Sequence, residues 1–168
     1  AHRLVVRCLS TKHFAIVPAT LMHNWLQCNE ADILEFQGFW DNLTLDRFMG
    51  DGGVYRFRRY DALALTLPGK PKLLPHAAYE QPNYINHLNS GVARHFDPLE
   101  SDFVQHPLFT RLLCVLAGAL DEVEEATQHW DIRIHPYRIR ADLGQAGLPT
   151  PEGLHRDGVD YIVIIMMD

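Results

Sequence analysis

The feature that most limits how this chain can fold lies near the end of the sequence, where a His and an Asp precede an apolar run. His155 and Asp157 are two positions apart, and the apolar run covers residues 162–167. In an extended segment, residues i and i+2 point to the same side, roughly 6.6 Å apart along the strand. These two side chains can therefore converge on one ion at the mouth of an apolar strand. Gly158 allows the chain to bend beside them without a side-chain clash.

One imidazole and one carboxylate are two parts of the 2-His-1-carboxylate set that holds non-haem Fe(II) with open positions. A His-x-Asp pattern alone is common, and its simpler interpretation is a loop-ordering hydrogen bond. In that case Asp157 accepts from backbone N–H groups near Gly158. Asp160 is a lesser candidate ligand, because its position five residues after His155 falls on the other side of a strand. The pattern alone leaves both interpretations open.

The residues around the pair add a family resemblance. The string PEGLHRDGVDYIVIIM at residues 151–166, with the strand-like segment 130–141 before it, resembles the bacterial 2-oxoglutarate/Fe(II)-dependent dioxygenase family of free amino-acid hydroxylases, such as isoleucine dioxygenase. The resemblance implies an α+β chain built on a double-stranded β-helix (jelly-roll or cupin-like), with N-terminal and flanking helices. Residues 1–168 would form a single domain, the N-terminal portion of that fold. With this string included, we favour the metal site.

The resemblance also implies an activity. His155 and Asp157 would act as catalytic metal ligands for Fe(II), with 2-oxoglutarate as co-substrate and ascorbate as reductant in an assay. The product would be a hydroxylated free amino acid or similar small metabolite, and the cofactors would carry the chemistry. A second His and the basic residue for 2-oxoglutarate would lie on later strands. We expect these strands beyond Asp168 or on another chain, because proteins normally cover an open strand edge.

Alternation from Trp130 to Arg140 predicts a strand. One of its faces begins apolar and turns basic, and it comprises Ile132, Ile134, Pro136, Arg138 and Arg140. Such a strand could reach from the core to a pocket. By resemblance its far end faces the cofactor region, which makes Tyr137 and Arg138 the expected contacts to 2-oxoglutarate or substrate. A salt-bridged strand end is the plain alternative.

Periodicity predicts helices at residues 20–28, 30–42 and 108–126 and strands at 14–17, 54–67 and 72–74. Asn29 is the expected N-cap of the second helix, and a turn at 68–71 would form a hairpin. The irregular stretch 75–106 is typical of a lid or binding loop. Its candidate pocket residues are Tyr79, Tyr84, Asn86 and Asn89, which surface turns would explain equally well.

Composition limits the partners. The net charge of −6 argues against a general nucleic-acid binder, and no apolar run reaches the roughly 20 residues that span a membrane. Three cysteines without CxxC spacing favour reduced thiols in a cytoplasmic protein. We therefore expect a small-molecule substrate, no nucleic acid and no membrane. The local basic cluster of Arg56, Arg58 and Arg59 is explained equally by a solvated strand face and by an acidic-ligand site.

Two other functions stay open at this point. A non-catalytic β-sandwich module for binding or assembly is favoured if the natural chain ends at Asp168. A zinc-type hydrolase could use His155, Asp157 and another His such as His135, and a closed tetrahedral site would support it. An unpaired strand edge would also make a homo-oligomer plausible.

Overall fold

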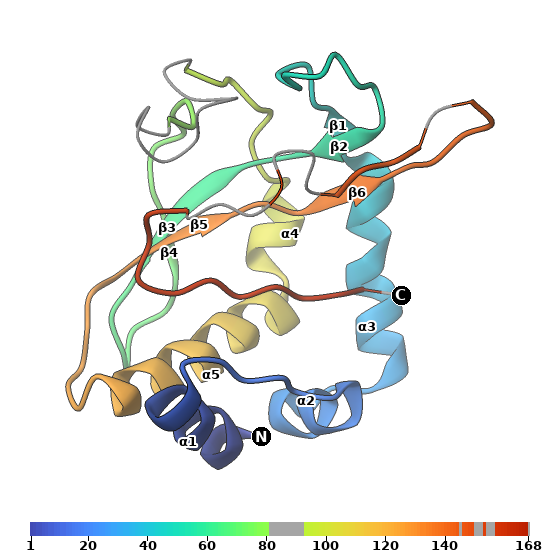
Figure 1. The fold of residues 1–168 in the computed structure, drawn as a ribbon. Coiled ribbons are helices and arrows are strands. Elements are labelled where there is room, and N and C mark those ends of the chain that lie inside the picture. The colour runs from blue at the N-terminus through green and yellow to red at the C-terminus, as the bar shows by residue number, and fades with distance from the viewer. Residues whose placement is uncertain (81–92, 145, 150–152, 154–156, 168) are drawn as a thin grey trace. The chain divides into compact units, whose positions relative to one another are not determined.

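A computed structural model of the chain describes residues 1–80, 93–144, 146–149, 153 and 157–167. Helices and small antiparallel sheets are mixed in it, which agrees with the expected α+β class. The chain divides into two compact units, one formed by residues 1–39, 61–75 and 99–134 and the other by residues 40–60, 76–98 and 135–168. Each unit has its own three-stranded sheet, as the strand labels of Figure 1 show.

The first unit contains the helices α1 (His2–Lys12), α2 (Ala19–Leu26), α3 (Glu30–Gln37), α4 (Ser101–Gln105) and α5 (Pro107–Val123). The long helix α5 confirms the predicted amphipathic helix, with Pro107 in its first turn and buried side chains on one face. Asn29 caps α3 in a capping box with Asp32, as predicted. The 3-10 helix η1 (Gly38–Asn42) continues the chain after α3.

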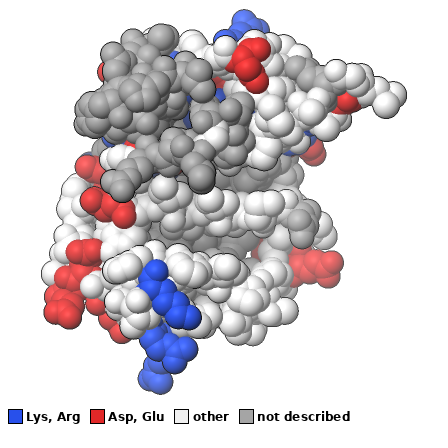
Figure 2. All heavy atoms as spheres, in the orientation of Figure 1, with Lys and Arg blue, Asp and Glu red and all other residues white. Residues whose placement is uncertain are grey.

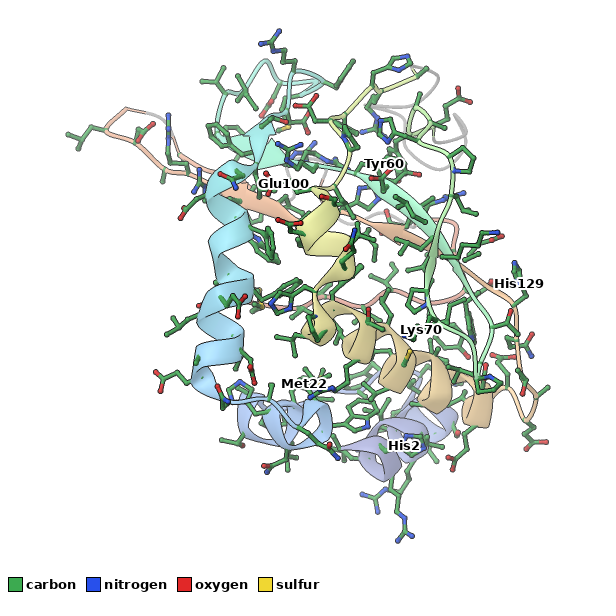
Figure 3. The ribbon with its side chains drawn as sticks, turned by 180° about the vertical axis from the view of Figure 1, so that it is seen from behind. His2, Met22, Tyr60, Lys70, Glu100 and His129 are labelled. Atoms are coloured by element: carbon green, nitrogen blue, oxygen red, sulfur yellow. The ribbon has the colours of Figure 1, made fainter. Side chains whose placement is uncertain are left out.

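The helices of this unit pack around aromatic side chains. Phe36 of α3 lies against Phe103 and Phe109, with ring centroids 4.9 and 6.2 Å away. Figure 1 shows α1 beside α5, and His2, labelled in Figure 3, contacts Glu122 of α5 at 2.7 Å. Helix α1 was not predicted, because no polar side chain caps its start and its first turn holds no acidic residue.

The sheet of the first unit has the order β4-β3-β5, with β3 (Asp61–Leu65) in the middle. Strand β3 pairs with β4 (Lys72–Leu73), which confirms the predicted hairpin, and with β5 (Trp130–Ile134). Leu63 and Leu65 alternate with half-buried residues and are almost completely buried. One face of β3 therefore packs against the core.

The sheet of the second unit has the order β1-β2-β6, built from β1 (Thr44–Leu45), β2 (Arg56–Arg58) and β6 (Tyr137–Ile139). All of its pairs are antiparallel, and Phe57 stands opposite Arg138. Arg138 and Arg140 lie over the Phe57 ring, 5.5 and 5.2 Å from its centroid. This contact covers one face of β2 and leaves the other face to Arg56 and Arg58.

The predicted long strands are each divided in two. The segment 54–67 separates into β2 and β3, and the segment 130–140 separates into β5 and β6. Pro136 lies at the second break, where a residue without an N–H cannot continue a ladder. Residues 14–17 are not a strand, so that prediction is wrong.

The apolar run 162–167 forms no strand either, and several of its side chains are exposed. The double-stranded β-helix stays a prediction. No helix within the described residues is long and apolar enough to cross a bilayer.

Candidate active site

The predicted metal-binding motif lies only partly within the described residues. Asp157 is half-buried in an irregular segment, whereas His155 lies outside the described residues. Gly153 and Gly158 have φ values of 69° and 68°, which favour glycine. The bend expected at Gly158 is therefore present, and the described residues from Asp157 onward form no strand. Asp160 is exposed.

Among the described residues, no group of three or more His, Cys, Asp or Glu side chains is arranged to hold a metal ion. The chemistry of the motif still fits Fe(II), because a carboxylate and an imidazole belong to the donor set that non-haem iron uses. Asp157 fits such a role by its half-buried position between two glycine bends. The pairing of His155 with Asp157 stays a prediction.

The two residues expected to contact 2-oxoglutarate or substrate lie at the edge of the second unit's sheet. Tyr137 is exposed, and Arg138 forms an ion pair with Asp41 at 3.1 Å. The side chains of this pair are 39% and 85% exposed for Arg138 and Asp41 respectively. That is the contact expected of a salt-bridged strand end, and exposed pairs of this kind contribute little stability. The roles of Tyr137 and Arg138 toward a cofactor stay predictions.

The arginines of β2 are buried instead of solvated. Arg56 is 8% exposed and Arg58 is 7% exposed, so the solvated-face interpretation is wrong for both. They are two residues apart and share the face of β2 opposite Phe57. On the face drawn in Figure 2, Lys and Arg side chains are seen mainly at the lower end, where several lie together.

Asp46 is the acidic partner of these arginines and is 1% exposed. Its carboxylate accepts from Arg56 Nε at 2.8 Å and lies 3.7 Å from Arg58 Nη1. It also accepts from the backbone N–H of Phe48 at 2.9 Å. One buried carboxylate thus faces two buried guanidinium groups.

Rings and a second arginine surround Arg58, and together they form what we call the arginine–aromatic cluster. It comprises Arg58, Tyr60, Tyr79, Arg94, Phe96 and His135. The Arg58 guanidinium carbon lies 4.0 Å from the Phe96 centroid, and that of Arg94 lies 4.8 Å from the Tyr79 centroid. Tyr60, labelled in Figure 3 where the chain passes from β2 to β3, stacks on His135 at 4.8 Å.

Segments far apart in the sequence bring the cluster together. Tyr79 and Arg94 form an isolated antiparallel bridge, with backbone N–H···O distances of 2.9 and 3.0 Å. His135 directly precedes the Pro136 break between β5 and β6. Tyr79 was among the predicted pocket residues, but Arg94 and Phe96 were missed, because no pattern marks them in the irregular stretch. Tyr84, Asn86 and Asn89 lie outside the described residues.

The hydrogen bond between Arg58 and His135 determines the tautomer of the neutral His135 imidazole. Arg58 Nη2 contacts His135 Nδ1. Because a guanidinium has no acceptor, His135 Nδ1 must accept, and a proton on the neutral ring sits on Nε2. Burial lowers the pKa of Arg58 to about 10, against the opposing effect of Asp46, so Arg58 stays positive at neutral pH. A positive charge beside His135 disfavours a zinc ion on this imidazole.

Comparisons with known proteins add the following findings. Residues 37–168 match the 2OG-Fe dioxygenase family. The crystal structure of a BsmA homologue from Methylobium petroleophilum PM1 superposes with a TM-score of 0.84 and 29% identity, over 95% of this chain and 64% of that one. IDO from Bacillus thuringiensis superposes with a TM-score of 0.71 and 17% identity, over 94% of this chain and 66% of that one, which shows a shared fold alone.

The chain thus spans about 64% of the length of the BsmA homologue. No curated protein sequence matches this chain.

Proposed function

Because this chain belongs to the 2OG-Fe dioxygenase family, we propose that it is part of an Fe(II)- and 2-oxoglutarate-dependent dioxygenase that hydroxylates a free amino acid or a similar small metabolite. The observation that carries the proposal is the family match, which extends over residues 37–168 and includes the His155–Asp157 motif. The non-catalytic module is not favoured, because the matched family is defined by dioxygenase chemistry.

Each residue of the motif has a separate task in this proposal. His155 and Asp157 hold Fe(II), and Asp157 supplies a hard anionic ligand that partly neutralises the metal charge. The glycines at positions 153 and 158 bend the backbone on either side of the pair. When bound, Fe(II), 2-oxoglutarate and O2 supply the oxidising chemistry and yield succinate, CO2 and a hydroxylated product. The chain itself binds and orients the reactants and keeps water away from them.

The test is succinate release by the full-length protein. The purified protein is supplied with Fe(II), ascorbate, 2-oxoglutarate and a pool of amino acids, and the pool is then divided to find the substrate. Asp157→Ala should abolish turnover, because it removes a metal ligand. Asp160→Ala is the matched control, since this neighbouring exposed carboxylate is not expected to bind the metal. Turnover that survives in Asp157→Ala would show that the assignment is wrong.

A further inference from the structure

The arginine–aromatic cluster is a buried, positively charged site to which the iron motif gives no role. We propose that it binds the carboxylate group of the small-molecule substrate, with Arg58 as the principal donor. The proposal rests on the proposed dioxygenase function. It adds a requirement for an acid group on the substrate and names the residues that recognise this group.

Two buried arginines of β2 share one buried carboxylate. Arg56 and Arg58 face the same carboxylate, and Asp46 lies closer to Arg56, at 2.8 Å, than to Arg58, at 3.7 Å. Within the described residues, Asp46 is the only ion-pair partner of Arg58. Buried charges are normally paired, so a single carboxylate shared in this way balances the positive charge of Arg58 only in part.

The side chain of Arg58 also carries a donor that can take a ligand oxygen. Its Nε is buried and makes no hydrogen bond within the part of the chain that the structure describes. A buried N–H without an acceptor is costly, whereas an acceptor that reaches it recovers this cost. A ligand oxygen at Nε would therefore bind with a free-energy gain that a solvated arginine could not provide.

The guanidinium of Arg58 is already held in place by its neighbours. One of its faces lies on Phe96 at 4.0 Å, and its Nη2 group donates to His135 Nδ1. Arg94 is 4% exposed and lies over the Tyr79 ring, which Arg58 also contacts, at centroid distances of 4.8 and 5.9 Å. Because the side chains are ordered in advance, a ligand loses little affinity to ordering them.

The chemistry of these donors selects a carboxylate. A guanidinium presents N–H groups in a planar fork that matches the two oxygens of a carboxylate, and buried charge-assisted hydrogen bonds are strong. The far carboxylate of 2-oxoglutarate has the same chemistry as a substrate carboxylate. The experiment must therefore distinguish a substrate carboxylate from the far carboxylate of 2-oxoglutarate.

The test observes Arg58 directly by NMR in the full-length protein loaded with diamagnetic Zn(II) in place of iron. The probes are isobutyrate and isobutyramide, which are similar in shape and differ in charge, and each is titrated with and without saturating 2-oxoglutarate. The Nε–Hε signal of Arg58 is assigned by its loss in Arg58→Lys. We expect isobutyrate to shift this signal in the presence of 2-oxoglutarate and to bind about ten-fold more tightly than isobutyramide.

Two results would overturn the proposal. If neither probe shifts the signal, or both shift it equally, the cluster does not recognise a carboxylate. If 2-oxoglutarate itself shifts the signal and blocks isobutyrate, the cluster serves the co-substrate instead. Both results leave the proposed dioxygenase function untouched, because that function is judged by succinate release.

Kinetics supply an independent readout with a matched control. Arg58→Lys keeps the positive charge but removes the planar set of guanidinium N–H donors. The control Arg47→Lys makes the same exchange at an exposed residue outside the cluster. We expect Arg58→Lys to raise KM for the amino-acid substrate about ten-fold with KM for 2-oxoglutarate unchanged, and Arg47→Lys to alter neither. Equal effects of the two variants would contradict the proposal. If Arg58→Lys does not fold, the Nε–Hε signal is assigned by its nuclear Overhauser contacts with the Phe96 ring, 4.0 Å from the guanidinium, and the NMR titration of the unaltered protein decides.

Discussion

Replacing Asp46 by Asn tests whether the buried arginines of β2 depend on the carboxylate that they share. The change preserves the shape of the side chain and removes its charge. Asp46 is 1% exposed and contacts Arg56 at 2.8 Å, so the two guanidinium groups would be left buried beside a neutral amide. Removing one partner of a buried ion pair costs about 3–5 kcal/mol. We expect Asp46→Asn to lower the free energy of unfolding by about this amount.

The assay is urea unfolding of the full-length protein followed by circular dichroism, with the free energy of unfolding taken from linear extrapolation. The matched control is Asp41→Asn, which removes the same charge from the pair between Asp41 and Arg138. That pair is 3.1 Å long and exposed, so its loss should cost less than about 1 kcal/mol. A cost for Asp46→Asn as small as that for Asp41→Asn would refute the view that Arg56 and Arg58 are buried cations in need of Asp46.

Two further predictions concern groups whose pKa values the fold shifts. The Tyr55 hydroxyl donates to Asp51 at 2.6 Å, and this hydrogen bond lowers the pKa of the Asp51 carboxyl in the folded protein. The ionised carboxylate therefore stabilises the folded state at a pH above its ordinary pKa. This stabilisation is lost as the pH falls through the lowered pKa of the folded state. Tyr55→Phe should raise the Asp51 pKa in an NMR titration, and an unchanged value would contradict the role of this hydrogen bond. Burial raises the thiol pKa of both Cys28 and Cys114. The negative charge of Asp32 raises the pKa of Cys28 further. Both should react with iodoacetamide at neutral pH more slowly than free cysteine, as measured by mass spectrometry, and equal rates would argue against their burial.

Local patterns predicted the elements whose contacts are local. Helix α5 was predicted because apolar residues recur at helical spacing, and the start of α3 because Asn29 is a strong cap. The hairpin between β3 and β4 was predicted from its turn residues. The division of the long strands was not predicted, because alternation continues through Pro136 even though the ladder partner changes there.

The contacts of the candidate site also could not be predicted from local sequence patterns. The sequence placed Arg56 and Arg58 on one strand face, and the structure agrees, but the sequence could not show whether this face is solvated or buried. The answer depends on Asp46, Tyr79 and other groups brought from distant segments, and no local pattern encodes these contacts. The His155–Asp157 motif was identified through its flanking string, and a family match now includes both residues.

The most direct test of the central proposal is Fe(II) binding by the full-length protein, measured by anaerobic equilibrium dialysis. The unaltered protein and Asp160→Ala should each retain iron, whereas His155→Ala and Asp157→Ala should each lose it, because both side chains are proposed ligands. Iron retained at full affinity in both His155→Ala and Asp157→Ala would contradict the proposed site.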